Sequence, residues 1–412
     1  MKILVFCWQN IFLQNTASAN RLRSLIEPLG DSGLEVQICI YGGYSSSEEK
    51  RTMGISGRVK GIDYVYLNLM TIQGFWKKRF IGYLGDVFIV DCLVRRITNY
   101  FNVGKNILWF DSSLVSFRVA VKLKKRNISN LKLFLEMSEY LDIHEYNISN
   151  FFQRWKARIT KIFFEKKAFY CFDGIALMTV ALFNHYLRFI PPQPRLLHLP
   201  MTVDLDRFKK NSEPLQYFKK PYIAFVGIMN NAKDGVDILI NAFSKIQHTI
   251  PEHTLYLVGP KHYDTPGHLE LIKRLSLENR VIWTGEYSRD QIPAIIDNAD
   301  LLVLPRPDSK QARGGFPTKL GEYLATGKPV CATSVGEIPN YLKNGESVYF
   351  AEPGSIDSFA EAMSRALNNY DEAKKVGVLG RKIAGQYFNK THQSGLLLEF
   401  FEKMYDGVST TC

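Results

Sequence analysis

The sequence predicts an α/β protein built from two doubly wound domains, each a parallel sheet covered by helices. First, 412 residues exceed the roughly 150 that one domain usually holds. Second, short apolar runs alternate with segments of helical period along most of the chain, which is typical of parallel sheets. Third, this alternation occurs twice, and the densest proline region, residues 191–221, separates the two series.

The first series of strands lies in the N-terminal half. We expect these strands at 2–7, 35–40, 64–69, 106–110, 131–137, 174–177 and 195–199. Apolar residues at i, i+3, i+4 and i+7 predict a helix over 22–29. The apolar segment 80–94 contains Asp86 and Asp91, so we expect a buried or interfacial helix there and no membrane span.

The second series begins after residue 220. We expect its strands at 222–226, 254–258, 280–284, 301–304, 329–332 and 347–350. The sequence thus divides into an N-terminal domain over 1–195, a hinge over 196–220 and a C-terminal domain from 221 to 388. Ligands of parallel α/β sheets bind beyond the carboxyl ends of the strands, so two facing domains predict a binding cleft.

The composition excludes several classes of protein. Hydrophobic residues make up 46% and charged residues 22%, which excludes a disordered chain, a helical rod and a small disulfide scaffold. The six cysteines are scattered without a C-x-x-C pair, which predicts reduced thiols in a cytoplasmic chain and no zinc or redox motif. The N-terminal apolar run is too short for a signal peptide.

The positive charge is concentrated in one quarter of the chain. Residues 75–170 contain 18 lysines and arginines against 8 aspartates and glutamates, which is +10 of the net +12. No nucleic-acid-binding motif accompanies this charge, so we expect no nucleic acid partner. A helix over 151–167 would combine basic and large apolar side chains, namely Arg154, Lys156, Arg158, Lys161 and Lys166 with Phe151, Phe152, Trp155, Ile159, Ile162 and Phe163. Two interpretations stay open: a helix that binds an anionic membrane surface, or a solvated basic face over a core stripe.

The segment 299–336 has the features of a nucleotide site. A hydrophobic strand leads through a glycine-containing loop to Pro317, which suits the first position of a helix. The amides of Thr318 and Lys319 at that helix start would bind phosphate. Glu322 shares a helix face with Lys319 and offers a carboxylate for vicinal hydroxyls. The alternative is a capped helix in which Lys319 and Glu322 form only a surface salt bridge.

Several motifs resemble the retaining glycosyltransferase family 4. Residues 317–330, PTKLGEYLATGKPV, are similar to the variant P-x-K-x-x-E-Y-x-A-x-G-K-P-V of its donor motif. Residues 199–208 resemble its P-x-x-V-D-x-x-x-F element, and Gly227 with Lys233 resembles its glycine-lysine loop. The resemblance covers roughly residues 195–365. It implies the GT-B fold, two Rossmann-like doubly wound domains facing a cleft, with the acceptor in the N-terminal domain and a final helix over 389–412 that packs back on that domain.

The resemblance also implies roles for individual residues. Glu322 would bind the donor ribose and Lys233 would stabilise the diphosphate leaving group. Thr318 and Lys319 would contact phosphate or sugar, and Gly227 belongs to the same donor loop. Fixed cationic donors can stabilise the charge that develops on a diphosphate without a metal, so no metal is predicted.

Two further donor-site residues and one acceptor-side residue are implied in the same way. Gly285 and Glu286 would lie beside the base. Glu139 follows the strand 131–137, where family members often carry an acidic residue near the reaction centre. Its alternative is a surface carboxylate. Other candidates on the acceptor side are Arg21, Asp111, Glu136 and His144.

The sequence departs from the family pattern at two places. Gly314 stands where the usual donor motif has its first glutamate, and no arginine follows Gly227. Either Arg306 or Arg313 would have to supply that charge. The triplet 204–206, Asp-Leu-Asp, matches a D-x-D metal motif, but it lies in the hinge and we interpret it as structural.

These features predict a metal-independent retaining glycosyltransferase. It would take a nucleotide-diphosphate sugar, with UDP or GDP as the expected nucleotide and no other cofactor. Its acceptor would be a saccharide or lipid-linked saccharide of bacterial surface polysaccharide synthesis, and the chain would be cytoplasmic and peripheral at the inner face of the membrane. The alternatives are a nucleotide-sugar epimerase of the same fold and a catalytically weak nucleotide-sugar-binding subunit.

Overall fold

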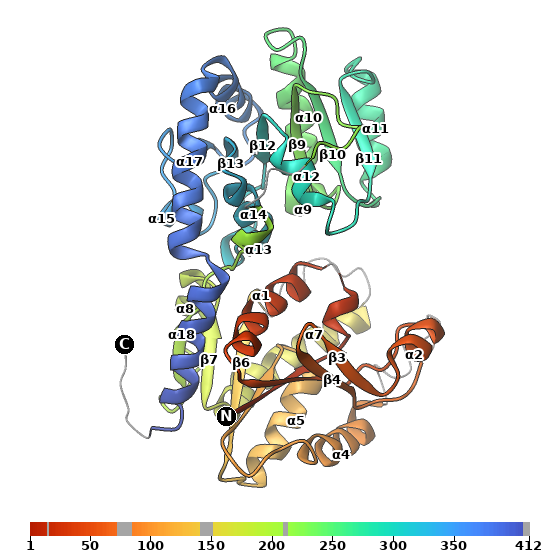
Figure 1. Cartoon of the computed structure of the whole chain (residues 1–412), viewed down its shortest axis with the longest axis vertical. Coiled ribbons are helices and arrows are strands. Elements are labelled where there is room, and N and C mark those ends of the chain that lie inside the picture. Colours follow the sequence, from red (N-terminus) through yellow and green to blue (C-terminus); the bar gives the residue numbers. More distant parts are fainter. Residues whose placement is uncertain (15, 72–84, 141–150, 209–212, 407–412) are drawn as a thin grey trace. The chain divides into compact units, whose positions relative to one another are not determined.

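The computed structural model describes residues 1–14, 16–71, 85–140, 151–208 and 213–406 (Figure 1). The chain forms two compact units. Unit 1 contains Met1–Leu199 and the residues from Thr391 onward, and unit 2 contains Pro200–Lys390. In sequence, unit 2 is therefore inserted between two parts of unit 1.

Unit 1 is built on an eight-stranded sheet in the order β3-β4-β2-β1-β5-β6-β7-β8. Its strands are β1 (Lys2–Cys7), β2 (Glu35–Ile40), β3 (Ser56–Val59), β4 (Ile62–Tyr66), β5 (Asn106–Phe110), β6 (Leu131–Met137), β7 (Gly174–Leu177) and β8 (Arg195–His198). All neighbouring pairs are parallel except β3 with β4. Strands β1 and β5 are buried along their whole length, as expected for central strands of a sheet covered on both faces.

The helices of unit 1 connect these strands. They are α1 (Ala17–Asp31), α2 (Ser47–Met53), α4 (Gly85–Thr98), α5 (Leu114–Lys125), α7 (Phe151–Phe163), α8 (Val180–Tyr186) and α18 (Lys390–Lys403), with the short helices η1 (Ile11–Leu13), η2 (Phe164–Ala168) and η3 (Phe169–Cys171). Side chains of Thr16, Ser113 and Thr179 cap α1, α5 and α8 by accepting a backbone N–H in the first turn.

Unit 2 contains a six-stranded, wholly parallel sheet in the order β11-β10-β9-β12-β13-β14. Its strands are β9 (Tyr222–Val226), β10 (Thr254–Val258), β11 (Val281–Gly285), β12 (Leu301–Leu304), β13 (Val330–Thr333) and β14 (Tyr349–Ala351). Its helices are η4 (Leu205–Phe208), α9 (Asn231–Asp234), α10 (Val236–Ile246), α11 (Thr265–Arg274), α12 (Ile292–Asp297), α13 (Lys310–Gly314), α14 (Thr318–Thr326), α15 (Ile338–Tyr341), α16 (Ile356–Asn368) and α17 (Tyr370–Tyr387).

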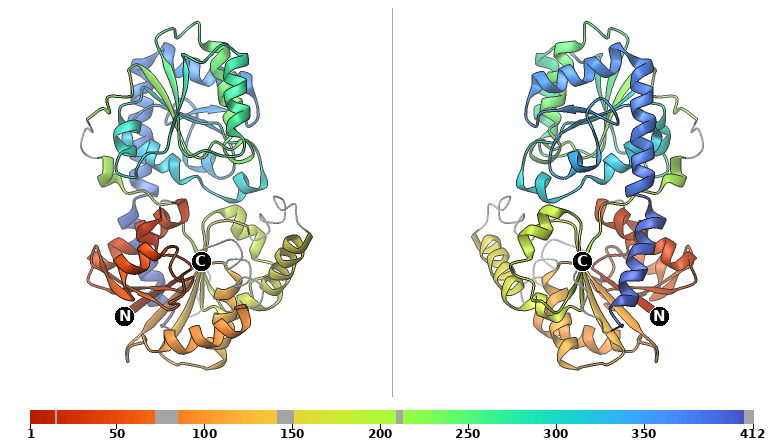
Figure 2. Two further views of the ribbon diagram at one scale, coloured as in Figure 1. Left: turned by 90° about the vertical axis from the view of Figure 1, so that its right-hand side faces the viewer. Right: turned by 90° about the vertical axis from the view of Figure 1, so that its left-hand side faces the viewer.

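Helices cover both faces of the unit 2 sheet (Figure 2). On one face, Ile223 and Phe225 of β9 share a core with α10, α11 and α16. On the other face, Tyr222 donates a hydrogen bond to the carbonyl of Ile295 in α12, and the hydroxyl of Tyr323 in α14 accepts one from the amide of Val226. Successive residues of a strand point to opposite faces, so β9 is buried between these two layers. The predicted α/β class with two doubly wound sheets is confirmed.

The last helix, α18, contributes to the core of unit 1. Phe401 packs edge-on against Trp109 and Phe134, with ring centres 6.1 and 4.9 Å apart. A β-carbon at Gly174 would come within 2.6 Å of the Met404 sulfur, so β7 and the end of α18 approach closely. Figures 1 and 2 show α18, in dark blue, running alongside the strands of unit 1. The residues after 390 thus complete a core that begins at residue 1.

One strand was not predicted. β3 pairs antiparallel with β4 through a tight turn at Lys60 and Gly61, both of which have positive φ (50° and 77°). Lysine followed by glycine gives a weaker turn signal than asparagine or aspartate followed by glycine, and only one of the four residues of β3, Val59, is apolar. The helix expected over 80–94 is described only from Gly85, as α4, and its residues Val90 and Leu93 are buried.

Candidate functional site

The start of α14 is arranged to leave backbone amides available. Pro317 occupies the N-cap position in an extended conformation and offers no side-chain cap. Thr318 and Lys319 follow as the first two helical residues, and both are half-buried. The first amides of a helix have no intrahelical acceptor, and the helix dipole places partial positive charge there. This helix start therefore suits an anionic ligand.

Lys319 lies at the centre of a buried group of charges. Its Nζ is 2.6 Å from Oδ1 of Asp234, whose side chain is only 4% exposed, and it lies 4.8 Å from the ring centre of Phe225. Burial lowers the pKa of Lys319, and the neighbouring cations Arg306 and Lys233 lower it further, whereas Asp234 opposes the shift. Lys319 is thus paired with a buried carboxylate, and Arg306 and Lys233 are near enough to act on its charge.

Gly227 leaves the space that Lys319 occupies. A β-carbon at position 227 would lie 2.2 Å from the lysine Nζ. Gly227 also donates to the carbonyl of Val258 over 2.9 Å, and its own carbonyl would lie only 1.8 Å from a β-carbon at Gly259. Gly259 in turn donates to the carbonyl of Gly285 over 2.8 Å. The carboxyl ends of β9, β10 and β11 are therefore held together, and Gly227, Lys319 and Gly285 belong to one edge of the sheet.

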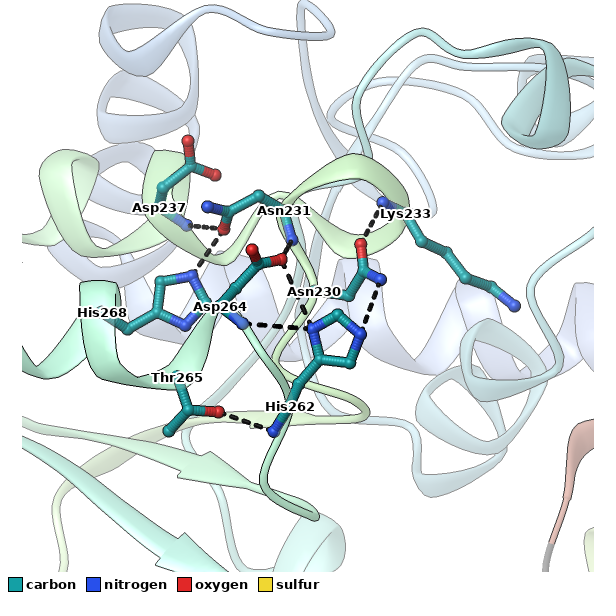
Figure 3. A network of polar contacts seen from close by, with 8 residues as sticks. All are labelled: Asn230, Asn231, Lys233, Asp237, His262, Asp264, Thr265 and His268. Carbon is teal, nitrogen blue, oxygen red and sulfur yellow. Dashed lines mark hydrogen bonds and ion pairs between the residues drawn. The ribbon is translucent and has the colours of Figure 1, made fainter. Parts of the chain in front are cut away.

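Lys233 lies on α9, which a polar network holds in place (Figure 3). The Oδ1 atom of Asn230 accepts from the amide of Lys233 over 2.9 Å. This leaves its Nδ2 as the donor to Nε2 of His262, 3.2 Å away. The Nδ1 atom of His262 lies 3.4 Å from Oδ2 of Asp264 and 3.5 Å from the backbone amide nitrogen of the same residue. The Lys233 side chain points away from this network (Figure 3).

A second asparagine, Asn231, caps the following helix, α10. The Oδ1 atom of Asn231 accepts from the amide of Asp237 over 3.2 Å and from Nε2 of His268 over 2.5 Å. Gly235, the N-cap of α10, has no side chain, so Asn231 supplies the missing cap. A side chain at position 235 would collide with the carbonyl of Pro305 at 2.0 Å, and its φ of 65° also requires glycine.

Glu322 lies one turn into α14 and pairs with a residue far away in sequence. Its Oε1 accepts from Nη1 of Arg207 over 2.7 Å, and the two side chains are 25% and 15% exposed. The alternative interpretation, a local pair between Glu322 and Lys319, is wrong, because each residue has a partner from another element. Glu286 follows Gly285 and is exposed.

The departures from the family pattern have a structural counterpart. Arg306 is 4% exposed and close enough to Lys319 to lower its pKa. Arg313 instead pairs with Asp308 on the surface, at 2.6 Å. Asp204, of the Asp-Leu-Asp triplet, forms an ion pair with Lys390 at 2.8 Å.

The acceptor-side candidates that the structure describes lie at the carboxyl ends of β5 and β6 or, like Arg21, pair with a residue there. Glu139 is exposed two residues beyond β6. Glu136 forms an ion pair at 2.7 Å with Arg21, which is 3% exposed. Asp111 is half-buried, the withdrawal of its carboxyl group from water raises its pKa, and the carboxylate accepts from Ser113, Ser116 and Tyr41. His144 lies outside the described residues.

Sequence reasoning assigned no role to Arg207, Asp234 or His262. Arg207 and Asp234 lie inside quoted motifs, but the contacts that matter link them to residues more than eighty positions away. His262 carries only a weak signal, a polar residue shortly after a buried strand.

A second candidate surface is the apolar stripe of α7, formed by Phe151, Trp155, Ile159 and Ile162. These side chains are 75%, 58%, 42% and 44% exposed. Their spacing of four, four and three residues places them along one side of the helix. Arg154 and Arg158 next to them are exposed as well. In the structure this stripe is therefore not part of a core. Among the described residues, no helix combines the length and the apolar character that crossing a bilayer requires.

Comparisons with known proteins agree with this architecture. Residues 220–369 match the family described as glycosyl transferases group 1. The chain is 26% identical over 220 residues to 2-deoxystreptamine glucosyltransferase of Streptomyces kanamyceticus, covering 50% of this chain and 54% of that protein. It is 26% identical over 208 residues to a GDP-mannose-dependent phosphatidylinositol monomannoside mannosyltransferase of Mycobacterium tuberculosis, covering 46% and 51%. The chain thus spans about half the length of these curated relatives.

Solved structures extend the fold comparison to the whole chain. Sucrose-phosphate synthase of Thermosynechococcus elongatus superposes with a TM-score of 0.75 at 15% identity, covering 99% of this chain and all of that one. Anabaena HepE in complex with UDP gives 0.68 at 16% identity, covering 98% and 100%. Residues 220–369 therefore match the glycosyl transferases group 1, the family whose donor motifs the sequence resembles, and the two units have the GT-B fold.

Proposed function

We propose that the chain is a retaining glycosyltransferase that transfers a sugar from a nucleotide-diphosphate sugar to a saccharide or lipid-linked saccharide. The observation that carries this proposal is the start of α14, where Lys319 pairs with the buried Asp234 and Glu322 follows one turn later. Cations and helix amides fit a diphosphate, and a carboxylate one turn further along fits the hydroxyls of a ribose.

The chemistry follows from these charges. The bond between sugar C1 and the diphosphate oxygen breaks, a bond from the acceptor oxygen to C1 forms on the same face, and the acceptor proton passes to the leaving phosphate. Negative charge grows on the diphosphate during this step. Lys233, Lys319 and the amides of Thr318 and Lys319 would stabilise that charge from fixed positions, so the proposed mechanism needs no metal.

The remaining donor and acceptor contacts are proposed from the places that their residues occupy in the sequence motifs and in the fold. Glu322 would bind the ribose, and Gly285 with Glu286 would lie beside the base. Glu139 would contact the acceptor from unit 1. UDP and GDP are the nucleotides that we expect; relatives include a GDP-mannose-dependent enzyme, and a structural neighbour was solved with UDP.

The first test is a thermal-shift titration with UDP, GDP, ADP and CMP, each with and without EDTA. A ligand that binds only the folded state raises the melting temperature. We expect a shift from one nucleoside diphosphate that EDTA does not change, and its loss in Lys233→Ala and Glu322→Ala. A shift that EDTA abolishes would contradict the metal-free mechanism. Binding without any sugar transfer would favour the binding-subunit alternative.

We also propose that the chain works as a peripheral protein at the inner face of the bacterial cell membrane, on surface polysaccharide precursors. The exposed apolar stripe of α7 with Arg154 and Arg158 beside it supports this, since anionic lipid surfaces bind amphipathic helices of this kind.

Flotation with vesicles tests the membrane proposal. Binding to vesicles that contain anionic lipid should weaken as salt rises, because salt screens the attraction between the arginines and the headgroups. Replacing Phe151 and Trp155 by serine should abolish flotation. The matched control is Tyr263→Ser in unit 2, which removes an equally exposed aromatic ring (76%) and should leave flotation unchanged. Equal flotation with anionic and with neutral vesicles would contradict the proposal.

A further inference from the structure

Arg207 connects two parts of the donor site. Its Nη1 donates to Oε1 of Glu322 and its Nη2 donates to the backbone carbonyl of Arg289, each over 2.7 Å. Glu322 lies on α14, whereas Arg289 lies in the loop that follows β11, shortly after Gly285 and Glu286. One guanidinium therefore fixes both the carboxylate proposed to bind ribose and the loop proposed to lie beside the base.

The geometry leaves the second carboxylate oxygen available. Among the described residues, the hydrogen bond to Glu322 comes from Arg207 and uses Oε1, so Oε2 keeps its capacity to accept. The guanidinium is planar and is oriented by its second bond to the Arg289 carbonyl, so it holds Oε1 of Glu322 in a more fixed direction than a flexible ammonium group would. The Arg207 side chain is 15% exposed, so water competes little with these two bonds.

The element that carries Arg207 is itself held in place. Arg207 belongs to η4, and the carbonyl of Phe208, the next residue, accepts from Nη2 of Arg381 over 3.2 Å. Two residues earlier, Leu205 lies near α17, since a β-carbon at Gly385 would be 3.7 Å from its side chain. The backbone that carries the Arg207 guanidinium is therefore held in place by α17.

We propose that Arg207 is a positioning residue of the donor site, which holds Glu322 and the loop after β11 in the one arrangement that binds the ribose hydroxyls. This inference rests on the proposed role of Glu322 in ribose binding. Arg207 itself touches neither sugar nor phosphate in this scheme; it acts through Glu322 and through the Arg289 carbonyl.

Affinities for ribose and deoxyribose nucleotides test the inference. The dissociation constants of UDP and 2′-deoxy-UDP, and of GDP and 2′-deoxy-GDP, are measured for the wild type, Arg207→Met, Arg207→Lys and Glu322→Gln. A hydrogen bond from a ribose hydroxyl to a carboxylate should give the wild type a preference of about tenfold for the ribose form. Arg207→Met should reduce this preference to about the Glu322→Gln value, and Arg207→Lys should retain part of it.

The ratio of the affinities for the ribose and the 2′-deoxyribose nucleotide distinguishes a positioning role from a general loss of fold stability. A variant that only loosens the fold lowers the melting temperature and weakens both nucleotides alike, so the ratio stays unchanged. The matched control is Arg58→Met, which removes an arginine–aspartate pair of unit 1 at 2.8 Å and should leave every affinity as in the wild type.

Three outcomes would overturn the inference. If the wild type distinguishes ribose and Arg207→Met does so equally, the positioning role is wrong and the proposed function stands. If Arg207→Met binds UDP or GDP more tightly, Arg207 competes with ribose for Glu322 instead of positioning it. If the wild type binds no nucleotide or shows no ribose preference, the proposed donor site is wrong and the inference falls with it.

Discussion

At the scale of single residues, the two charged side chains of α14 show what spacing along a helix can and cannot reveal. Lys319 and Glu322 stand three positions apart, close enough to pair with each other. In the structure Lys319 pairs with Asp234 and Glu322 with Arg207. Lys319 is half-buried and pairs with the buried Asp234, because an unpaired carboxylate in the interior is costly. Such a partner is set by tertiary packing, and no local pattern identifies it.

His268 gives a pH dependence to the network that supports Lys233. It is 3% exposed, burial lowers its pKa, and Asp264 and Asp237 oppose that shift while His262 adds to it. The unfolded chain takes up this proton near the ordinary histidine pKa of about 6.5, whereas the folded chain takes it up only at lower pH. The folded state therefore loses stability as the pH drops below the unfolded-state pKa of about 6.5. The contribution of His268 to this loss ends once the pH is below its pKa in the folded chain.

We expect His268→Gln to reduce this loss of stability. The amide can still donate to Asn231 but does not titrate. Between about pH 7 and pH 5, urea unfolding should show a loss smaller by about 1 kcal/mol in the variant than in the wild type. Part of the pH dependence of stability should remain in the variant, because burial also lowers the pKa of His253. His248→Gln, at an exposed position, is the control, and a profile for His268→Gln that matches it would contradict the prediction.

At the scale of elements, α14 is packed closely by neighbours from distant parts of the chain. A β-carbon at Gly321 would meet the Met201 side chain at 2.8 Å and the Val203 side chain at 3.2 Å. From another direction, a β-carbon at Gly377 of α17 would lie 2.3 Å from the carbonyl of Gly327 at the end of α14. The helix that presents the proposed phosphate and ribose contacts thus has little room to shift.

Gly377→Ala in α17 should therefore destabilise unit 2, although alanine is the better helix former, because its β-carbon would meet the backbone of Gly327 and Lys328 at 2.3–2.8 Å. Overpacking of this kind costs about 1–3 kcal/mol, which outweighs the gain of roughly 1 kcal/mol in helix propensity. Urea unfolding followed by circular dichroism measures the difference. Gly267→Ala in α11 is the control, because no atom lies within 4 Å of its β-carbon, and it should be neutral or stabilising. Equal effects of the two substitutions would show that the backbone contacts around Gly377 relax freely.

At the scale of the whole molecule, the class of fold was predictable and the contacts that build the site were not. Apolar runs such as 2–7, 106–110 and 222–226 are buried on both sides, so composition alone marks them as central strands. The order in which the strands pair depends on crossovers that no local pattern contains. The same holds for the site: the motif placed Lys319 and Glu322 on one helix, but their partners come from α9 and η4.

The separate cores of the two units lead to a prediction about unfolding. Phe401 is fully buried in the core of unit 1, and removing an aromatic ring from a core costs about 3–5 kcal/mol. In Phe401→Ala we expect hydrogen exchange to accelerate in β5 and β6 and to stay unchanged in β9 and β10. Glu399→Ala, exposed on the same helix, should change neither set. Equal acceleration in all four strands would show that the two units unfold together.

The two chain segments that enter and leave unit 2 are hydrogen-bonded to each other. The amide of Val203 donates to the carbonyl of Phe388 over 2.7 Å, that of Lys390 donates to the carbonyl of Val203 over 3.0 Å, and Asp204 pairs with Lys390. The ends of this unit therefore meet at one point, and joining them would close only a short loop at small entropic cost. Unit 2 could therefore be excised at a single junction, circularly permuted, or exchanged for the corresponding domain of a relative, while both halves of unit 1 keep their connection points.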